Sequence, residues 1–108
     1  MKTYLANAFS LSMLPPKNVV ISVEEINVEK AREALLSGFE SAIGHEATAQ
    51  FLTYLLGFPV PIKRVPIQLN SGDALIVFQL LSRLPEGKIL TVEEMRQIPY
   101  KFFAVKVL

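Results

Sequence analysis

The sequence has no cysteine and a single histidine among its 108 residues. Without cysteine there can be no disulfide framework, no thiolate metal site and no cysteine nucleophile. This absence fits a reducing cytoplasm, where we expect the protein to act. One histidine cannot make a typical zinc site, and the scattered carboxylates do not favour a two-metal nuclease. We therefore expect a function that needs neither a metal nor another cofactor.

Long apolar runs, glycine motifs and excess charge are also missing. No run reaches the roughly 18 to 20 apolar residues of a membrane helix, and the first seven residues are too short and polar for a secretory signal. Neither Gly57 nor Gly72 has the spacing of a P-loop or a dinucleotide fingerprint. A net charge of +1 excludes tight binding of long duplex nucleic acid by bulk electrostatics. A small anionic ligand held by a few local cations remains possible.

Length and pattern predict one α/β domain over residues 1–108. The apolar segments predict five strands, at residues 3–9, 19–23, 62–69, 74–81 and 102–108. Helices are expected at residues 28–37 and 45–56, with a short third helix after Thr91. This order predicts a mixed sheet of about five strands flanked by helices. Half of the residues are hydrophobic, which suggests a homodimer that covers some of this surface.

Two details of the sheet follow from local signals. The nearly continuous apolar run 19–23 predicts a buried central strand. The turn sequence 70–73 predicts a hairpin between 62–69 and 74–81. Pro66 indicates that the first of these strands lies at an edge or is distorted.

His45 is the first candidate for chemistry, because it begins the predicted helix 45–56 directly after Gly44. Free N–H groups at a helix start bind phosphate, and Gly44 would let a ligand approach the backbone closely. Histidine exchanges a proton near neutral pH and can serve as a general acid or base. Residue type and spacing alone favour a capping or surface histidine without a role.

Other polar residues follow predicted strands and could contact a ligand. Arg83, Glu86 and Lys88 follow the strand 74–81, a common place for function in α/β sheets, although an ordinary charged loop has the same pattern. Three polar residues follow the first strand, and they are standard turn residues as well as possible ligand contacts: Asn7, Ser10 and Ser12. Arg64 could add positive charge or simply protect an edge strand.

Three motifs together are more specific than any of these residues alone. They are Tyr4-Leu5-Ala6-Asn7-Ala8-Phe9-Ser10, Ile43-Gly44-His45 and Arg83-Leu84-Pro85-Glu86-Gly87-Lys88-Ile89-Leu90-Thr91. In this order and at these separations, the chain resembles the viral and mobile-element ring nucleases that act as anti-CRISPR proteins against type III systems. The resemblance covers essentially the whole chain.

The resemblance implies a homodimer that binds cyclic tetra-adenylate and cuts it without metal to linear di-adenylate. It places the catalytic histidine at His45, with Arg83 and Glu86 beside it. It places ligand contacts at Asn7, Ser10 and Arg64, and Ser12, Gly44 and Lys88 complete the expected binding set.

Two alternatives stay open at this point. The first is a sponge that sequesters a cyclic oligonucleotide without cutting it. The second is a structural or regulatory protein of a mobile element that binds a protein partner.

Overall fold

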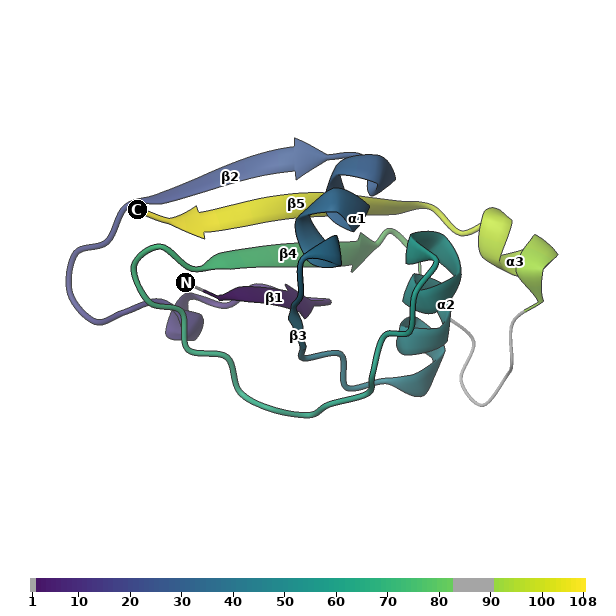
Figure 1. The fold of residues 1–108 in the computed structure, drawn as a ribbon, viewed down its shortest axis with the longest axis horizontal. Coiled ribbons are helices and arrows are strands. Elements are labelled where there is room, and N and C mark those ends of the chain that lie inside the picture. Colours follow the sequence, from purple (N-terminus) through teal and green to yellow (C-terminus); the bar gives the residue numbers. More distant parts are fainter. Residues whose placement is uncertain (1, 83–90) are drawn as a thin grey trace.

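Strand β4 lies at the centre of a five-stranded mixed sheet in the computed structural model, which describes residues 2–82 and 91–108 (Figure 1). The order is β2-β5-β4-β1-β3, with bounds Thr3–Ala6 (β1), Ile21–Ile26 (β2), Glu40–Ser41 (β3), Ala74–Leu80 (β4) and Tyr100–Val107 (β5). β1 runs parallel to β3 and β4, whereas β5 runs antiparallel to β4 and β2. The expected fold class, a small α/β domain with a mixed sheet of five strands, is confirmed.

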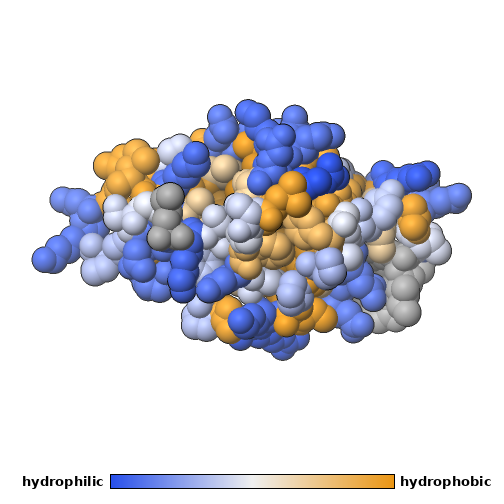
Figure 2. Space-filling view, viewed as in Figure 1, coloured by the Kyte–Doolittle hydropathy of each residue, from blue (hydrophilic) through white to orange (hydrophobic). Residues whose placement is uncertain are grey.

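Helices α1 (Val28–Leu36) and α2 (Glu46–Leu56) pack on one face of this sheet (Figure 1). Four aromatic rings join α2 to strands β4 and β5, with neighbouring centroids 5.2 to 6.0 Å apart: Phe51, Phe78, Tyr100 and Phe102. Such ring pairs stabilise a core beyond the area that they bury. Seen from the helix side, hydrophobic residues reach the surface between hydrophilic ones in the middle of the molecule (Figure 2).

The opposite face of the sheet is covered in a different way. In the described part of the chain, loops and the short 3-10 helix η1 (Leu11–Met13) pack there around a second apolar cluster that includes Leu69, Leu75 and Val105. This cover is incomplete, because Val23 on β2 remains 57% exposed.

The predicted helices are confirmed to within two residues, because local capping sets their ends. Asn27 accepts a hydrogen bond from the backbone N–H of Lys30 at 2.9 Å and begins α1. Gly57 ends α2 with a φ of 80°, a conformation that favours glycine. Thr91 and Glu94 form the predicted capping box of α3 (Val92–Arg96).

The prediction of a buried central strand at 19–23 is wrong. The strand β2 starts at Ile21 and lies at the end of the strand order, paired with β5 alone. Residues Val20 and Val23 are 66% and 57% exposed. A continuous apolar run does not specify which neighbours a strand has, and here one side of β2 faces no other strand of the described sheet.

The predicted strand 62–69 and its hairpin are also wrong. Ile62 makes one isolated parallel bridge with Ile43, and the rest of 62–69 is irregular. Proline lacks the N–H that a strand ladder needs, and Pro61 directly precedes this segment while Pro66 interrupts it. The place beside β4 belongs instead to β1, whose Thr3 pairs with Ala74. The two-residue strand β3 was too short to predict from its sequence.

A side chain from α1 holds the end of α2. The guanidinium of Arg32 donates from Nε to the carbonyl of Leu56 at 2.9 Å and from Nη2 to that of Leu55 at 2.8 Å. The last carbonyls of a helix have no partner within the helix, so these bonds satisfy two of them. α2 is therefore fixed at its C-terminal end by α1.

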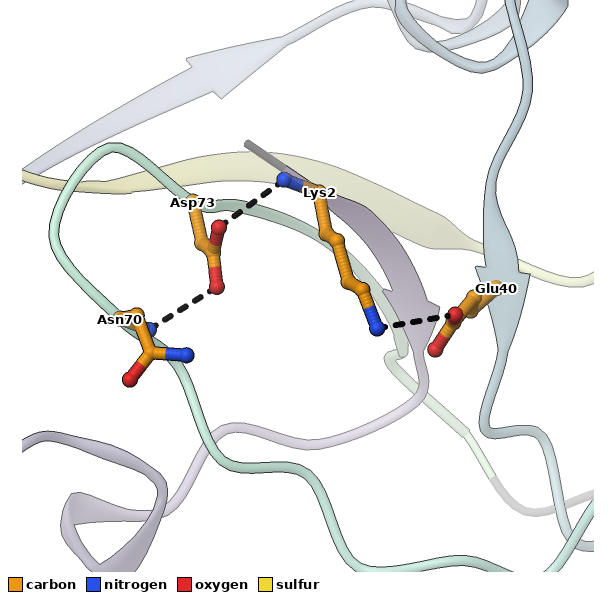
Figure 3. A network of polar contacts seen from close by, with 4 residues as sticks. All are labelled: Lys2, Glu40, Asn70 and Asp73. Carbon is orange, nitrogen blue, oxygen red and sulfur yellow. Dashed lines mark hydrogen bonds and ion pairs between the residues drawn. The ribbon is translucent and has the colours of Figure 1, made fainter.

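The buried carboxylate of Asp73 joins the start of β1 to the turn before β4 (Figure 3). It accepts backbone hydrogen bonds from Lys2 and Asn70, both at 2.9 Å. Burial raises the pKa of Asp73, but these two N–H donors together with nearby positive charge hold the pKa below its ordinary value. Nearby, the exposed Lys2 ammonium lies 3.4 Å from Glu40, and this partner raises the pKa of Lys2.

Replacing Asp73 with asparagine is expected to lower the free energy of unfolding at pH 7 by about 1 to 3 kcal/mol, because an amide cannot accept both hydrogen bonds. Because the pKa of Asp73 is lower in the folded state, its carboxylate stabilises the fold above the unfolded pKa of about 3.9. This contribution is lost as the pH falls through the folded pKa. Urea unfolding at pH 7 and pH 3 checks the prediction, since the difference in stability between the two proteins should be smaller at pH 3, which lies below the unfolded pKa. The control Glu40→Gln, which removes only the exposed ion pair, should change little. An equal loss at both pH values would contradict the assignment.

Candidate functional site

Three parallel strands end at the same edge of the sheet, and each leads into one of the three motifs. Asn7 follows β1, the segment Ile43-Gly44-His45 follows β3, and β4 leads toward Arg83. The strands are neighbours in the order β4-β1-β3, so their carboxyl ends lie side by side. This edge is where α/β sheets usually bind ligands. The topology thus brings segments about 40 residues apart in the sequence to one place.

His45 is the N-cap residue of α2, as predicted. Its backbone is extended, with φ −122° and ψ 132°, and its carbonyl accepts the N–H of Ala49 at 3.0 Å. The imidazole makes no capping hydrogen bond to the helix and is exposed. The ring is therefore available for chemistry. Glu46 in the first turn adds a negative charge that weakens the attraction of this helix start for anions.

Arg64 lies against the residue that precedes this histidine. Its Nε donates to the carbonyl of Gly44 at 2.9 Å. A Cβ on Gly44 would come within 3.0 Å of Cγ of Arg64. The space beside Gly44, expected to admit a ligand, is thus occupied by the stem of Arg64. The structure brings three predicted residues together here: Gly44, His45 and Arg64.

A separate group of predicted residues lines a depression of about 420 Å³. Asn7 and Ser12 face it together with Gln68, and the rest of its wall is mainly apolar. Ser10 does not line it. Its hydroxyl caps η1 and lies 3.0 Å from the hydroxyl of Ser12. Ser10 thus affects the depression only through its hydrogen bonds to Ser12.

The two groups are adjacent along the chain without forming one cavity. Ala42 and Val65 belong to the wall of the 420 Å³ depression, and they stand two residues before Gly44 and one after Arg64. His45 does not line the 420 Å³ depression. The predicted residues Arg83, Glu86 and Lys88 lie outside the described residues.

A second depression, of about 460 Å³, shares Asn7 with the first and opens onto the incompletely covered face of the sheet. Its floor is apolar, with Val23, Val77 and Phe103. Gln79 also lines it, and the sequence analysis missed this residue. The available signal was that Gln79 is the one polar side chain in the apolar run 74–81.

Neither a cluster of metal ligands nor a membrane-spanning helix is found in the part of the chain that the structure describes. Across residues 2–82 and 91–108, no group of three histidine, aspartate or glutamate side chains is placed to hold a metal ion. None of the helices in these ranges has the length and apolar character needed to cross a membrane.

Comparison with known proteins assigns the family. The family model described as STIV B116-like matches residues 3–102. The chain belongs to the STIV B116-like family. B116 of Sulfolobus turreted icosahedral virus has the same fold, with a TM-score of 0.87 and 30% identity, over 98% of this chain and 99% of B116.

Members of the STIV B116-like family occur in several archaeal viruses. Uncharacterized protein 26 of Sulfolobus islandicus filamentous virus (isolate Iceland/Hveragerdi) is 42% identical over 96% of this chain and 90% of that protein. Uncharacterized protein ORF117 of Acidianus two-tailed virus is 38% identical over 78% of this chain and 75% of its own length. A bacterial relative, YddF of Bacillus subtilis (strain 168), is 29% identical over 89% of this chain and 92% of YddF.

Proposed function

We propose that this STIV B116-like protein is a metal-independent ring nuclease that cleaves cyclic tetra-adenylate in the cytoplasm of the host cell. Cleavage to linear di-adenylate would shut off type III CRISPR signalling. The observation that carries the proposal is that the segments holding Asn7 and His45 follow β1 and β3 at the same edge of the sheet where β4 ends. Arg64 beside Gly44 and His45 adds a cation to this edge.

The chemistry needs no metal because the nucleophile belongs to the substrate. A ribose 2′-hydroxyl loses its proton to water and attacks the adjacent phosphorus, and the bond from phosphorus to the 5′-oxygen breaks, which leaves a 2′,3′-cyclic phosphate end. His45, which is exposed and makes no capping bond, donates a proton to the departing 5′-oxygen. Arg83 stabilises the charge on the phosphoryl oxygens, and Glu86 positions Arg83 or a ribose hydroxyl.

Ligand binding draws on the polar residues around the two depressions. Asn7, Ser12 and Gln79 can donate and accept hydrogen bonds, as the edges of adenine and the ribose hydroxyls require. Arg64 and Lys88 supply positive charge for the phosphates.

A second copy of the chain completes the site in this proposal. The ring of four equal nucleotides has a two-fold axis, which can coincide with the axis of a homodimer. The apolar groove of Val23, Val77 and Phe103 lies beside Asn7, so a partner seated there would close the ligand site. The ion pair of Glu25 and Lys101, 3.5 Å apart on the adjoining strands, offers a second copy one charge of each sign. Two copies of each cation would then face four phosphates.

Replacing Val23 with glutamate is expected to weaken the dimer by about 10-fold or more, because burying an unpaired charge costs more than about 1.4 kcal/mol. Val23 is 57% exposed, so the fold should tolerate the change. Sedimentation velocity over a range of concentrations measures the effect. Val20→Glu is the matched control, since Val20 is 66% exposed and lies outside the groove. Dimers that are unaffected by Val23→Glu, or equally weakened by both variants, would place the interface elsewhere.

The function is tested by incubating labelled cyclic tetra-adenylate with excess folded protein in EDTA. We expect linear di-adenylate carrying a 2′,3′-cyclic phosphate. An intact ring after many minutes with dimeric protein would overturn the proposal.

One observation favours a second candidate, a sponge that binds the ring without cutting it. The depression that holds Asn7 and Ser12 does not include His45, so these residues could hold a ligand away from the imidazole. Tight binding of the intact ring in the same assay would support the sponge. A regulatory protein of a mobile element would bind no cyclic oligoadenylate of any ring size.

A further inference from the structure

The segment 61–64 is tied to the segment 41–44 by three successive hydrogen bonds. The hydroxyl of Ser41 donates to the carbonyl of Pro61. The backbone N–H of Lys63 donates to the carbonyl of Ile43 at 2.8 Å, and Nε of Arg64 donates to the carbonyl of Gly44 at 2.9 Å. These hydrogen bonds of the irregular segment, most of which was predicted to be a strand, therefore fix the position of the chain that leads to His45.

The last of these bonds reaches His45 most directly. The carbonyl of Gly44 belongs to the peptide group whose nitrogen is that of His45, and a peptide group is planar. Fixing this oxygen therefore orients the bond that leads into His45. On the C-terminal side of His45, its own carbonyl accepts the N–H of Ala49. The backbone of His45 is thus held from both directions while its imidazole makes no capping bond.

Position 44 needs glycine because of its contact with Arg64. Among the described residues, the glycines with positive φ are Gly38, Gly57 and Gly72, so Gly44 does not need glycine for its backbone conformation. A Cβ at this position would instead approach Cγ of Arg64 to 3.0 Å. Such a contact forces the stem of Arg64 to move. Gly44 and Arg64 therefore form a matched pair.

We propose that Arg64 is a positioning residue for His45 that acts through the carbonyl of Gly44. This inference rests on the proposed function for its effect on cleavage. Arginine can fill the role while still facing an anion, because Nε is used here and two further nitrogens carry donors. Lysine has a single ammonium and cannot hold the carbonyl in the same geometry.

The first arm of the test needs no activity, because His45 is the only histidine in the chain and gives one imidazole Cε1–Hε1 signal in an NMR spectrum. We expect Gly44→Ala and Arg64→Met to shift or broaden this signal. Lys63→Met, next to Arg64 in the chain, is the control and should leave it in place. A signal that is the same in all four proteins would overturn the inference. Arg64 is exposed, so Arg64→Met should fold even if Gly44→Ala does not.

The second arm separates positioning from ligand binding with cyclic tetra-adenylate. Gly44→Ala keeps every cation, so we expect the single-turnover rate to fall by about 10- to 100-fold, the scale of a misplacement near 1 Å, while Kd changes much less than this rate. If Arg64 were only a phosphate contact, Gly44→Ala would cleave at the parent rate, and Arg64→Met would raise KM without lowering the single-turnover rate. If the parent protein does not cleave, the proposed function fails while the NMR arm still decides the positioning role.

Discussion

Cleavage of cyclic tetra-adenylate is expected to fall by about 10²- to 10⁴-fold when His45 is replaced by asparagine, which is the usual contribution of a general acid. Binding of the ring should be retained, since the imidazole acts on the leaving oxygen rather than on ligand affinity. Asparagine is the right replacement because it is one of the best N-cap residues. Helix α2 should therefore begin as before, and a loss of rate would not reflect unfolding. Single-turnover cleavage and equilibrium binding measure the two quantities.

A modified substrate makes this test specific for proton donation. When sulfur replaces the bridging 5′-oxygen, the leaving thiolate needs no proton, so the acid has little to contribute. We expect His45→Asn and the parent protein to cleave this ring at similar rates. A defect of equal size on both substrates would mean that His45 positions the ligand or the helix instead.

The same variant separates the enzyme from the sponge. A sponge would bind the ring and protect it equally well with asparagine at position 45. Parent and variant that bind alike and leave the ring intact would therefore support sequestration and contradict catalysis by His45.

Replacing Phe78 with alanine is expected to lower the free energy of unfolding by about 3 to 5 kcal/mol, the usual cost of removing a buried phenylalanine. Phe78 is fully buried in β4, with ring centroids 5.7 Å from Phe51 and 5.2 Å from Phe102. Phe51 belongs to α2, which starts next to His45. The ring therefore joins the helix of the proposed acid to the central strand. The free energy of unfolding of a natural domain is roughly 5 to 15 kcal/mol in total, so this substitution would remove much of it.

Urea unfolding at neutral pH measures this loss. Leu36→Ala is the matched control, because Leu36 is 65% exposed at the end of α1 and should change stability by less than about 0.5 kcal/mol. Phe78→Leu should lose less than Phe78→Ala, since it leaves a smaller cavity. Equal losses in Phe78→Ala and Leu36→Ala would contradict the packing described here.

Features that depend on neighbours in the chain could be predicted from the amino-acid order. The helices begin and end where the caps of Asn27, Gly57 and Thr91 indicated, because a cap is a contact within one turn of helix. His45 was correctly placed at a helix start because the residues after it have helical apolar spacing, although its own side chain makes no capping bond. The absence of cysteine also limited the chemistry from the outset.

Features that depend on distant partners could not be predicted in this way. The apolar run 19–23 had the composition of a central strand, yet β2 became an edge because β1 and β5 took both sides of β4. The prolines at 61 and 66 kept the segment 62–69 out of the sheet. This segment instead lies beside Gly44, where Arg64 donates a hydrogen bond to the Gly44 carbonyl. No local pattern indicates that Arg64 lies against a residue 20 positions earlier.

The candidate site also combines residues that could be recognised from the sequence with an arrangement that depends on distant contacts. Asn7 and His45 were recognisable one by one as polar residues after a strand and at a helix start. They lie at the same edge of the sheet because β3, a strand of two residues, pairs in parallel with β1 and leads the following segment to that edge. Residue type and local spacing indicated which side chains can do chemistry. Strand pairing, which depends on contacts between residues far apart in the chain, brought their segments together.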